Sequence, residues 1–142
     1  MSIYQIVIDT NVFVSALKSN QGASYKLLMM LGTSQFETNV SIPLVLEYEE
    51  VAKRLIDQIA LTENDVDSII DYVCKVSNHH EIFFLWRPFL KDPDDDMVLE
   101  LAVTAKCQFI VTHNQKDFLR IDQFGIKAVS PKEFLQEIGA IS

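Results

Sequence analysis

The chain contains short, continuous apolar runs, of which Ile6-Val7-Ile8 is the first, and segments with helical periodicity separate them. A strand that is buried on both faces is apolar throughout, whereas a strand with one exposed face alternates. Strands in alternation with helices form βαβ units, because parallel strands need a crossover connection. The sequence therefore predicts an α/β fold, a three-layer α/β/α sandwich with a central, mainly parallel sheet.

The expected elements fill one domain that spans residues 1–142. Strands are expected at residues 3–9, 36–41, 82–86, 108–112 and 127–129. Helices are expected at residues 11–18, 23–32, 43 to about 59, from a cap at Thr62, from the acidic run 92–96 to about 106, and from Pro131 onward. The helix starts carry local signals, because Pro43 and Pro131 suit the first helical turn and Ser130 with Glu133 forms a capping box.

The bulk composition excludes some classes of protein. No apolar stretch is long enough to span a bilayer, and we expect no signal peptide, so the expected location is the cytoplasm. Cys74 and Cys107 lie far apart, which favours two reduced thiols. The net charge of −8 argues against a broad nucleic-acid-binding surface. It leaves open an enzyme that concentrates carboxylates around metal ions.

Asp9 ends the first apolar run, and Thr10 and Asn11 follow it directly. An aspartate at this position is a common helix N-cap. It also lies just beyond the carboxyl end of a strand, where ligands bind in open parallel sheets. Asp9 alone leaves both interpretations open.

A second group of acids lies in the helix after Pro43. Glu50 projects to nearly the opposite side from the apolar stripe, whereas Glu47 and Glu49 flank it. Glu47 has apolar neighbours on both sides, so its carboxylate can reach over the sheet edge. We favour a solvated helix face for Glu49 and Glu50, although spacing alone does not separate Glu47 from Glu49.

The third group is the run Asp92-Pro93-Asp94-Asp95-Asp96. A calcium-binding loop is excluded, because the required glycine and final glutamate are missing. An acidic helix start that complements the helix dipole is the simpler alternative. Helical projection places Asp96 on a polar face with Glu100 and Thr104, and Asp95 on the apolar side. A carboxylate there is costly unless it is paired or metal-bound, so Asp95 is the first candidate ligand and Asp94 the second.

The fourth group follows the strand that ends near Thr112. Asn114 and Asp117 lie in a segment just past that strand, where turn residues are the alternative explanation. Two groups at strand ends and two on flanking helices together predict a site of hard oxygen ligands. Such ligands favour Mg²⁺ or Mn²⁺ over zinc.

The ordered set of motifs resembles the PIN domain family of metal-dependent ribonucleases. The motifs are the apolar strand before Asp9-Thr10-Asn11, Glu47 in Leu-Glu-Tyr-Glu-Glu-Val, Asp-Pro-Asp-Asp-Asp before Leu-Glu-Leu-Ala, and Val-Thr-His-Asn with Lys-Asp-Phe. The resemblance covers nearly the whole chain and implies hydrolysis of RNA phosphodiester bonds with Mg²⁺ or Mn²⁺. It implies the catalytic residues Asp9, Glu47, Asp95 and Asp117, and the metal ligands Asp9, Asp95, Asp117 and Asn114.

The resemblance also implies supporting roles and partners. Thr10, Asn11 and Thr112 would orient carboxylates or a bound water, with Asp94 also assisting. The cations Lys91, Lys116 and Arg120 would contact RNA phosphates, with simple surface solvation as the alternative. The motifs look closest to bacterial toxin components of toxin–antitoxin pairs, so we expect a small antitoxin partner, and homodimers are common in the family.

Two departures and two alternatives accompany the resemblance. Position 114 is an amide where many relatives have aspartate, and His113 replaces a small residue at the entrance. An inactive or weakly active scaffold that kept the fold is therefore the main alternative function. A phosphatase with an aspartyl nucleophile is a poor alternative, because the second aspartate that it would need is Asn11.

Overall fold

The structure is a computed structural model that describes residues 3–82 and 89–142. Its strands are β1 (Tyr4–Ile8), β2 (Phe36–Val40), β3 (Asn78–His79), β4 (Phe109–Val111) and β5 (Lys127–Val129). Its α-helices are α1 (Thr10–Lys18), α2 (Ala23–Met29), α3 (Ile42–Arg54), α4 (Glu63–Val76), α5 (Pro93–Thr104) and α6 (Pro131–Glu137). The 3-10 helices are η1 (Ile56–Gln58), η2 (Gln115–Phe118) and η3 (Ile121–Phe124).

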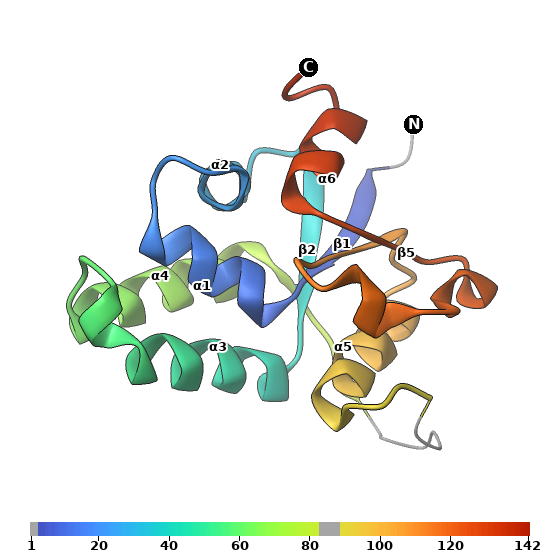
Figure 1. Ribbon diagram of the computed structural model, residues 1–142, viewed down its shortest axis with the longest axis horizontal. Helices are drawn as coiled ribbons and strands as arrows, with labels where there is room; N and C mark the ends of the chain where they lie inside the picture. The colour runs from blue at the N-terminus through green and yellow to red at the C-terminus, as the bar shows by residue number, and fades with distance from the viewer. Residues whose placement is uncertain (1–2, 83–88) are drawn as a thin grey trace.

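The five described strands form one parallel sheet in the order β3-β2-β1-β4-β5. The helices α1 to α4 gather on one side of the strands and α5 lies on the other (Figure 1). The predicted α/β sandwich with a central parallel sheet is therefore confirmed. The chain passes from β1 to β2 on one side and later enters β4 on the other, so a crevice is expected at the carboxyl end of β1.

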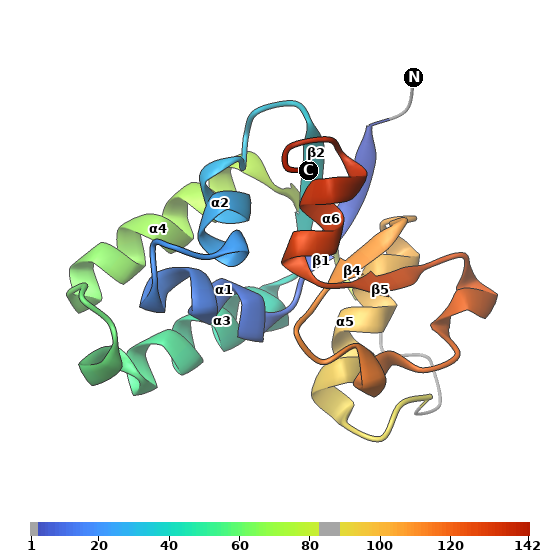
Figure 2. The ribbon, with the colours of Figure 1, turned by 45° about the horizontal axis from the view of Figure 1, so that its top comes forward.

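Helix α6 closes the face of the sheet opposite α5, and the central strands pass between these two helices in Figure 2. Phe134 of α6 is fully buried and packs edge-on against the rings of Tyr4, Phe36 and Phe109. These three rings come from β1, β2 and β4, so a single side chain ties the last helix to the middle of the sheet.

Capping chemistry sets the helix starts as the sequence predicts. Thr62 and Asp65 exchange two hydrogen bonds at the start of α4, and Ser130 and Glu133 do the same at the start of α6. Both capping boxes satisfy backbone N–H groups that the first helical turn leaves without partners.

Some predicted boundaries are wrong for identifiable reasons. The helix after Pro43 ends at Arg54 rather than near residue 59, because Leu55 leaves the helical conformation. Ile59 is nevertheless buried, so its apolar periodicity reflects packing beyond the end of the helix. The helix predicted over residues 23–32 ends at Met29, and Gly32 follows in the left-handed conformation that favours glycine.

The strand predicted over residues 82–86 falls almost entirely outside the described residues, and Ile82 itself is not in a strand. The described edge strand is β3, where Asn78 and His79 pair with Asn39 and Val40 of β2. This pairing is supported by polar contacts, because Asn78 donates to Glu37 at 3.0 Å and His80 shares a hydrogen bond with Asn39 at 2.8 Å. The described edge strand therefore consists of polar residues.

Candidate functional site

Asp9 is both a helix cap and a group at the crevice. Its backbone N–H extends the sheet by donating to Val111 O at 2.9 Å. One carboxylate oxygen accepts from the N–H of Thr10 at 2.9 Å, and the other accepts from Thr112 Oγ1 at 2.8 Å. The carboxylate is thus fixed at the carboxyl ends of two adjacent strands, β1 and β4.

Burial shapes the chemistry of Asp9, whose side chain is only 7% exposed. Burial raises the pKa of Asp9, the hydrogen bonds from Thr112 and Thr10 oppose that shift, and the charge of Asp117 adds to it. The structure therefore holds a nearly buried carboxylate with a second carboxylate close enough to repel it.

Glu47 on α3 reaches this same position. Thr10 Oγ1 donates to Glu47 Oε1, which joins α3 to the first turn of α1. Burial raises the pKa of Glu47, and the charges of Asp94 and Asp9 add to the effect. Of the three glutamates on this helix, Glu47 is therefore the one that faces the crevice.

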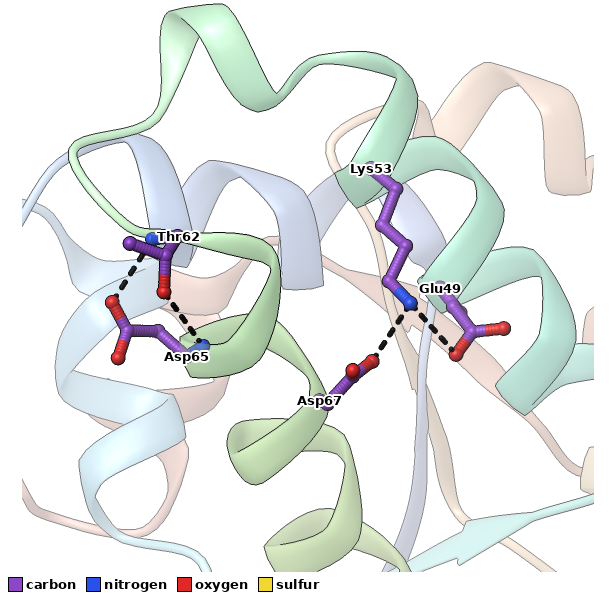
Figure 3. Close-up of polar contacts among 5 residues, drawn as sticks. All are labelled: Glu49, Lys53, Thr62, Asp65 and Asp67. Carbon is purple, nitrogen blue, oxygen red and sulfur yellow. Dashed lines mark hydrogen bonds and ion pairs between the residues drawn. The ribbon is translucent and has the colours of Figure 1, made fainter.

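Glu49 and Glu50 have other partners on the outer surface of α3. Lys53 lies 3.4 Å from Glu49 and 2.8 Å from Asp67 of α4 (Figure 3). Arg54 lies 3.4 Å from Glu50, one helical turn away. We call Glu49, Glu50 and Asp67 the paired acids, because each carboxylate has a cation beside it.

The start of α5 brings further carboxylates to the crevice. Asp92 caps the helix by accepting from the N–H of Asp94 at 2.9 Å. Asp95 is half-buried, and its pKa is raised to about 7 by burial first and then by the charges of Asp9, Asp92, Asp117 and Asp94. The sequence predicted Asp95 on the apolar side of this helix. In the structure, Asp95 lies close enough to Asp9 for the charge of Asp9 to raise its pKa.

Asp96 has hydrogen-bond partners before α5 that the predicted polar face with Glu100 and Thr104 did not anticipate. Asp96 Oδ1 accepts from the N–H groups of Phe89 and Leu90 at 3.2 and 2.8 Å, so it fixes the segment that enters α5. Glu100, its predicted neighbour on that polar face, is only 6% exposed. Residues 97–102 of α5, after the first turn, are buried on more sides than helical projection implied, and Asp96 has a structural role just before them.

The segment after β4 contributes Thr112 and Asp117. Thr112 is fully buried, and its hydroxyl accepts from the N–H of Asn114 at 3.0 Å while it donates to Asp9. Asp117 lies in η2 and is exposed, yet its charge acts on both Asp9 and Asp95. We call Asp9, Glu47, Asp95 and Asp117 the edge cluster, because they gather at the carboxyl edge of the sheet.

Asn11 and His113 tie the walls of the crevice together. Asn11 Oδ1 accepts from the N–H of His113 at 3.2 Å, and Asn11 Nδ2 donates to Thr112 Oγ1 at 3.4 Å. His113 Nε2 lies 3.2 Å from Oγ of Ser24, which lies in the first turn of α2. Asn114 is exposed beside them, on the same segment.

The sequence-predicted cations lie on the periphery of this region. Lys91 and Lys116 are exposed, and the guanidinium of Arg120 lies over the ring of Phe89, 5.1 Å from its centre. Within residues 3–82 and 89–142, none of the ion pairs joins a cation to the edge cluster. The charge of His113 lowers the pKa of Asp9, but the edge cluster has no ion-pair partner among the described residues.

Sequence reasoning missed Tyr48, which it assigned only to the apolar stripe of its helix. Tyr48 is buried, stacks on Phe13 with ring centres 4.5 Å apart, and donates its hydroxyl to Ile8 O. It anchors α3 to the last residue of β1, immediately before Asp9. A tyrosine in an otherwise aliphatic stripe is the signal that could have revealed it, because a buried hydroxyl needs a partner.

The chemistry of the edge cluster fits a divalent cation, although its carboxylates do not converge on one point. Among the described residues, no group of three or more histidine, cysteine, aspartate or glutamate side chains is arranged to hold a metal ion. Burial, and then the charges of nearby carboxylates, raise the pKa of Asp9, Glu47 and Asp95. A cation near Asp9, Asp95 and Asp117 would offset the repulsion among these carboxylates. Their oxygen ligands suit Mg²⁺ or Mn²⁺.

The comparison with known families agrees with this architecture. A PIN domain model matches residues 5–116, a span that includes β1, the edge cluster except Asp117, and β4. The chain belongs to the PIN domain family, whose members are generally nucleases. It is also similar to an uncharacterized protein of Methanocaldococcus jannaschii, MJ1680, with 27% identity over 94% of this chain and 90% of that protein.

These comparisons leave the finer predictions open. The archaeal relative carries no assigned activity, so the resemblance to bacterial toxins remains a prediction. Within the residues that the structure describes, no helix has the length and apolar character required to cross a membrane.

Proposed function

We propose that the chain is a metal-dependent endoribonuclease whose active site is the edge cluster. The observation that carries this proposal is the gathering of carboxylates, without ion-pair partners among the described residues, at the topological switch point of the sheet, with the pKa of Asp95 raised to about 7. Membership in a family of nucleases supports it. The RNA substrate and the metal come from the resemblance of the motifs.

In this proposal Asp9, Asp95, Asp117 and Asn114 hold Mg²⁺ or Mn²⁺. The bound cation supplies Lewis acidity toward the phosphate and lowers the pKa of a bound water. Thr112 and the N–H of Thr10 fix the orientation of the Asp9 carboxylate through the hydrogen bonds described above.

Glu47 is the carboxylate best placed to exchange a proton at the crevice. Its side chain lies partly out of water, and this burial raises its pKa above the ordinary value, while the hydrogen bond from Thr10 opposes the shift. Asn11 would assist by holding the segment after β4. Asp94 would add negative charge beside the cation. Lys91, Lys116 and Arg120 remain our candidates for contacts with RNA phosphates.

The test is cleavage of end-labelled single-stranded and structured RNA by the purified protein with Mg²⁺ or Mn²⁺. We expect the wild type to produce discrete fragments and Asp9→Asn to lose activity by a factor of about 100 or more. The matched control is Asp67→Asn, the same chemical change at a paired acid, which should cleave like the wild type. Equal cleavage by Asp9→Asn and the wild type would contradict the proposal, and absence of cleavage by the wild type would favour the inactive scaffold.

We further propose that the chain acts as the toxin of a toxin–antitoxin pair, with a small antitoxin protein as its partner. This part rests on the resemblance of the motifs alone. Induced expression should arrest growth of a bacterial host for the wild type but not for Asp9→Asn, and the product of an adjacent small reading frame should co-purify with the chain and restore growth. Sedimentation of the free protein would test the expected homodimer.

A further inference from the structure

A cavity lined in part by His113, the residue after Thr112, plays no part in the mechanism above. It has a volume of about 280 Å³ and lies between the end of α1, the start of α2, His113 in the segment after β4, and the start of α6. Helices α2 and α6 lie side by side in both ribbon views (Figures 1 and 2). The cavity is therefore formed by three segments that are far apart in the sequence: residues 15–25, His113 and residues 130–132.

The lining of this cavity differs in charge from the rest of the molecule. Lys132 and four serines contribute to it, and no aspartate or glutamate is found among the described residues that line it. This contrasts with a chain in which acids outnumber lysine and arginine by 20 to 12. The cavity thus combines a cation with hydroxyl groups in an otherwise acidic protein.

The hydroxyls in this cavity are suited to donate. Ser19 Oγ accepts from the N–H of Gln21 at 3.2 Å, and Ser130 Oγ accepts from the N–H of Glu133 at 3.1 Å. A hydroxyl that accepts from a backbone N–H still carries its own proton for donation. Donor hydroxyls beside an ammonium group favour a ligand rich in acceptor oxygens, such as a phosphate diester.

His113 separates this cavity from the edge cluster. Its side chain shares a hydrogen bond with Ser24 in the cavity wall, while its backbone N–H donates to Asn11. The preceding residue, Thr112, holds Asp9. A chain that occupies the cavity would therefore continue past His113 toward Asp9.

We infer that this cavity is a subsite for one ribose-phosphate unit of the RNA strand, next to the bond that the edge cluster cuts. The inference rests on the proposed ribonuclease activity. The volume lies slightly below the range typical of sites that enclose a whole small ligand, as expected for one unit of a longer chain. Lys132 binds the phosphate, and the half-buried ring of Tyr25 gives the sugar or base an aromatic wall.

The first test measures the salt dependence of RNA binding in an Asp9→Asn background, which prevents cleavage. The affinity for a fluorescent single-stranded RNA is measured by anisotropy across a series of KCl concentrations. Lys132→Gln should weaken binding roughly threefold to tenfold and reduce the slope of log affinity against log salt by about 0.7, the value for one phosphate contact on a single strand. The charge-matched control Lys75→Gln, on α4, should leave the slope unchanged.

The second test fills the cavity without straining the backbone. Gly22 lines the cavity with φ −100° and ψ 175°, and an added Cβ would meet no described atom within 4 Å. Gly22→Leu should therefore fold and weaken RNA binding by obstruction. Gly22→Ser is the matched control, because it changes the same position with a small side chain and should bind like the parent. Thermal unfolding of each variant confirms that the fold is intact.

The outcomes separate the two proposals. If the wild type cuts RNA while Lys132→Gln and Gly22→Leu bind RNA like their controls, the subsite is wrong and the active-site proposal stands. If the wild type does not cut RNA but binding still depends on Lys132 and Gly22, the subsite stands and the proposed activity is wrong. If RNA binds to none of the proteins, both proposals are overturned.

Discussion

The molecule holds its carboxylates in two different ways. The paired acids on α3 and α4 each have a lysine or arginine beside them, and the nearby capping box pairs Asp65 with Thr62 (Figure 3). The edge cluster gathers at the carboxyl end of β1 with no cation paired to it in the described part of the chain. In the edge cluster, burial and the charges of carboxylates on other elements of the fold raise the pKa of Asp9, Glu47 and Asp95.

This difference separates structural acids from candidate functional ones. A carboxylate whose pKa is lowered in the folded state, such as Asp65, adds to stability at neutral pH. A carboxylate whose pKa is raised, such as Asp95, subtracts from it. Groups that cost stability and lie together in a crevice are the ones for which a functional reason is needed.

The largest expected effect concerns catalysis by the edge cluster. Asp95→Asn should reduce RNA cleavage by a factor of about 100 or more, because it removes a charge that faces the proposed cation. Glu49→Gln, which neutralises a paired acid on α3, should retain cleavage within a factor of about two. Rates of fragment formation under single-turnover conditions provide the comparison. Equal losses in both variants would show that the two regions do not differ in function.

The next effect is a pH dependence of stability in metal-free buffer. The pKa of Asp95 is about 7 in the folded protein against an ordinary value of 3.8, so the folded state binds more protons between these pH values. The free energy of unfolding should therefore fall as the pH rises from about 4 to about 7. After allowance for solvent screening, we expect Asp95 to contribute about 1–2 kcal/mol to this fall.

Urea unfolding with EDTA at several pH values measures this dependence. Asp95→Asn should be more stable than the wild type at pH 7.5. Its free energy of unfolding should also fall much less than that of the wild type as the pH rises. Asp65→Asn is the control of opposite sign, since the lowered pKa of Asp65 gives stability above its ordinary range that disappears as the pH falls. An Asp95→Asn protein that is less stable than the wild type at pH 7.5 would argue against repulsion in the edge cluster.

A smaller effect is expected from the capping box of α4. Thr62→Ala removes the acceptor for the N–H of Asp65 and should lower the free energy of unfolding by about 1 kcal/mol. Thr62→Ser keeps a capping oxygen and should recover most of it. Cleavage at a temperature where both variants are folded should match the wild type. A marked loss of activity in Thr62→Ala would couple the two regions.

The smallest effect belongs to the bridging lysine of the paired acids. Lys53→Met leaves Glu49 and Asp67 without their shared cation, but all three side chains are substantially exposed to water. We expect the midpoint of thermal unfolding to fall by at most about 2 °C. Scanning calorimetry measures the change, and a fall several times larger would mean that these pairs contribute more to the fold than their exposure suggests.

The sequence predicted most of the fold because its local signals agree with one another. Continuous apolar runs identified β1 and β4, and the predicted cap at Thr62 and capping box at Ser130 marked two helix starts. The short strand β3 escaped prediction because it consists of Asn78 and His79, whose pairing depends on partners in β2 rather than on their own preferences. Edge strands of two polar residues leave no periodic signal.

For candidate residues that lie on one helix, the periodicity of that helix was enough to choose between neighbours. Projection separated Glu47 from Glu50 and Asp95 from Asp96, although it misjudged the surroundings of Asp96. Contacts between distant segments could not be predicted, because the hydrogen bonds of Thr10 with Glu47 and of Ser24 with His113 join residues 37 and 89 positions apart. Such contacts depend on how the elements pack, which local pattern does not specify.

The most direct test of the central claim is calorimetric titration of the protein with Mn²⁺ at pH 7.5. The edge cluster should bind the ion in the wild type, and Asp95→Asn should bind it at least about tenfold more weakly because a ligand charge is lost. Glu50→Gln removes the same charge from a paired acid and should bind like the wild type. Equal binding by all three proteins, or no binding by a folded wild type, would contradict the account.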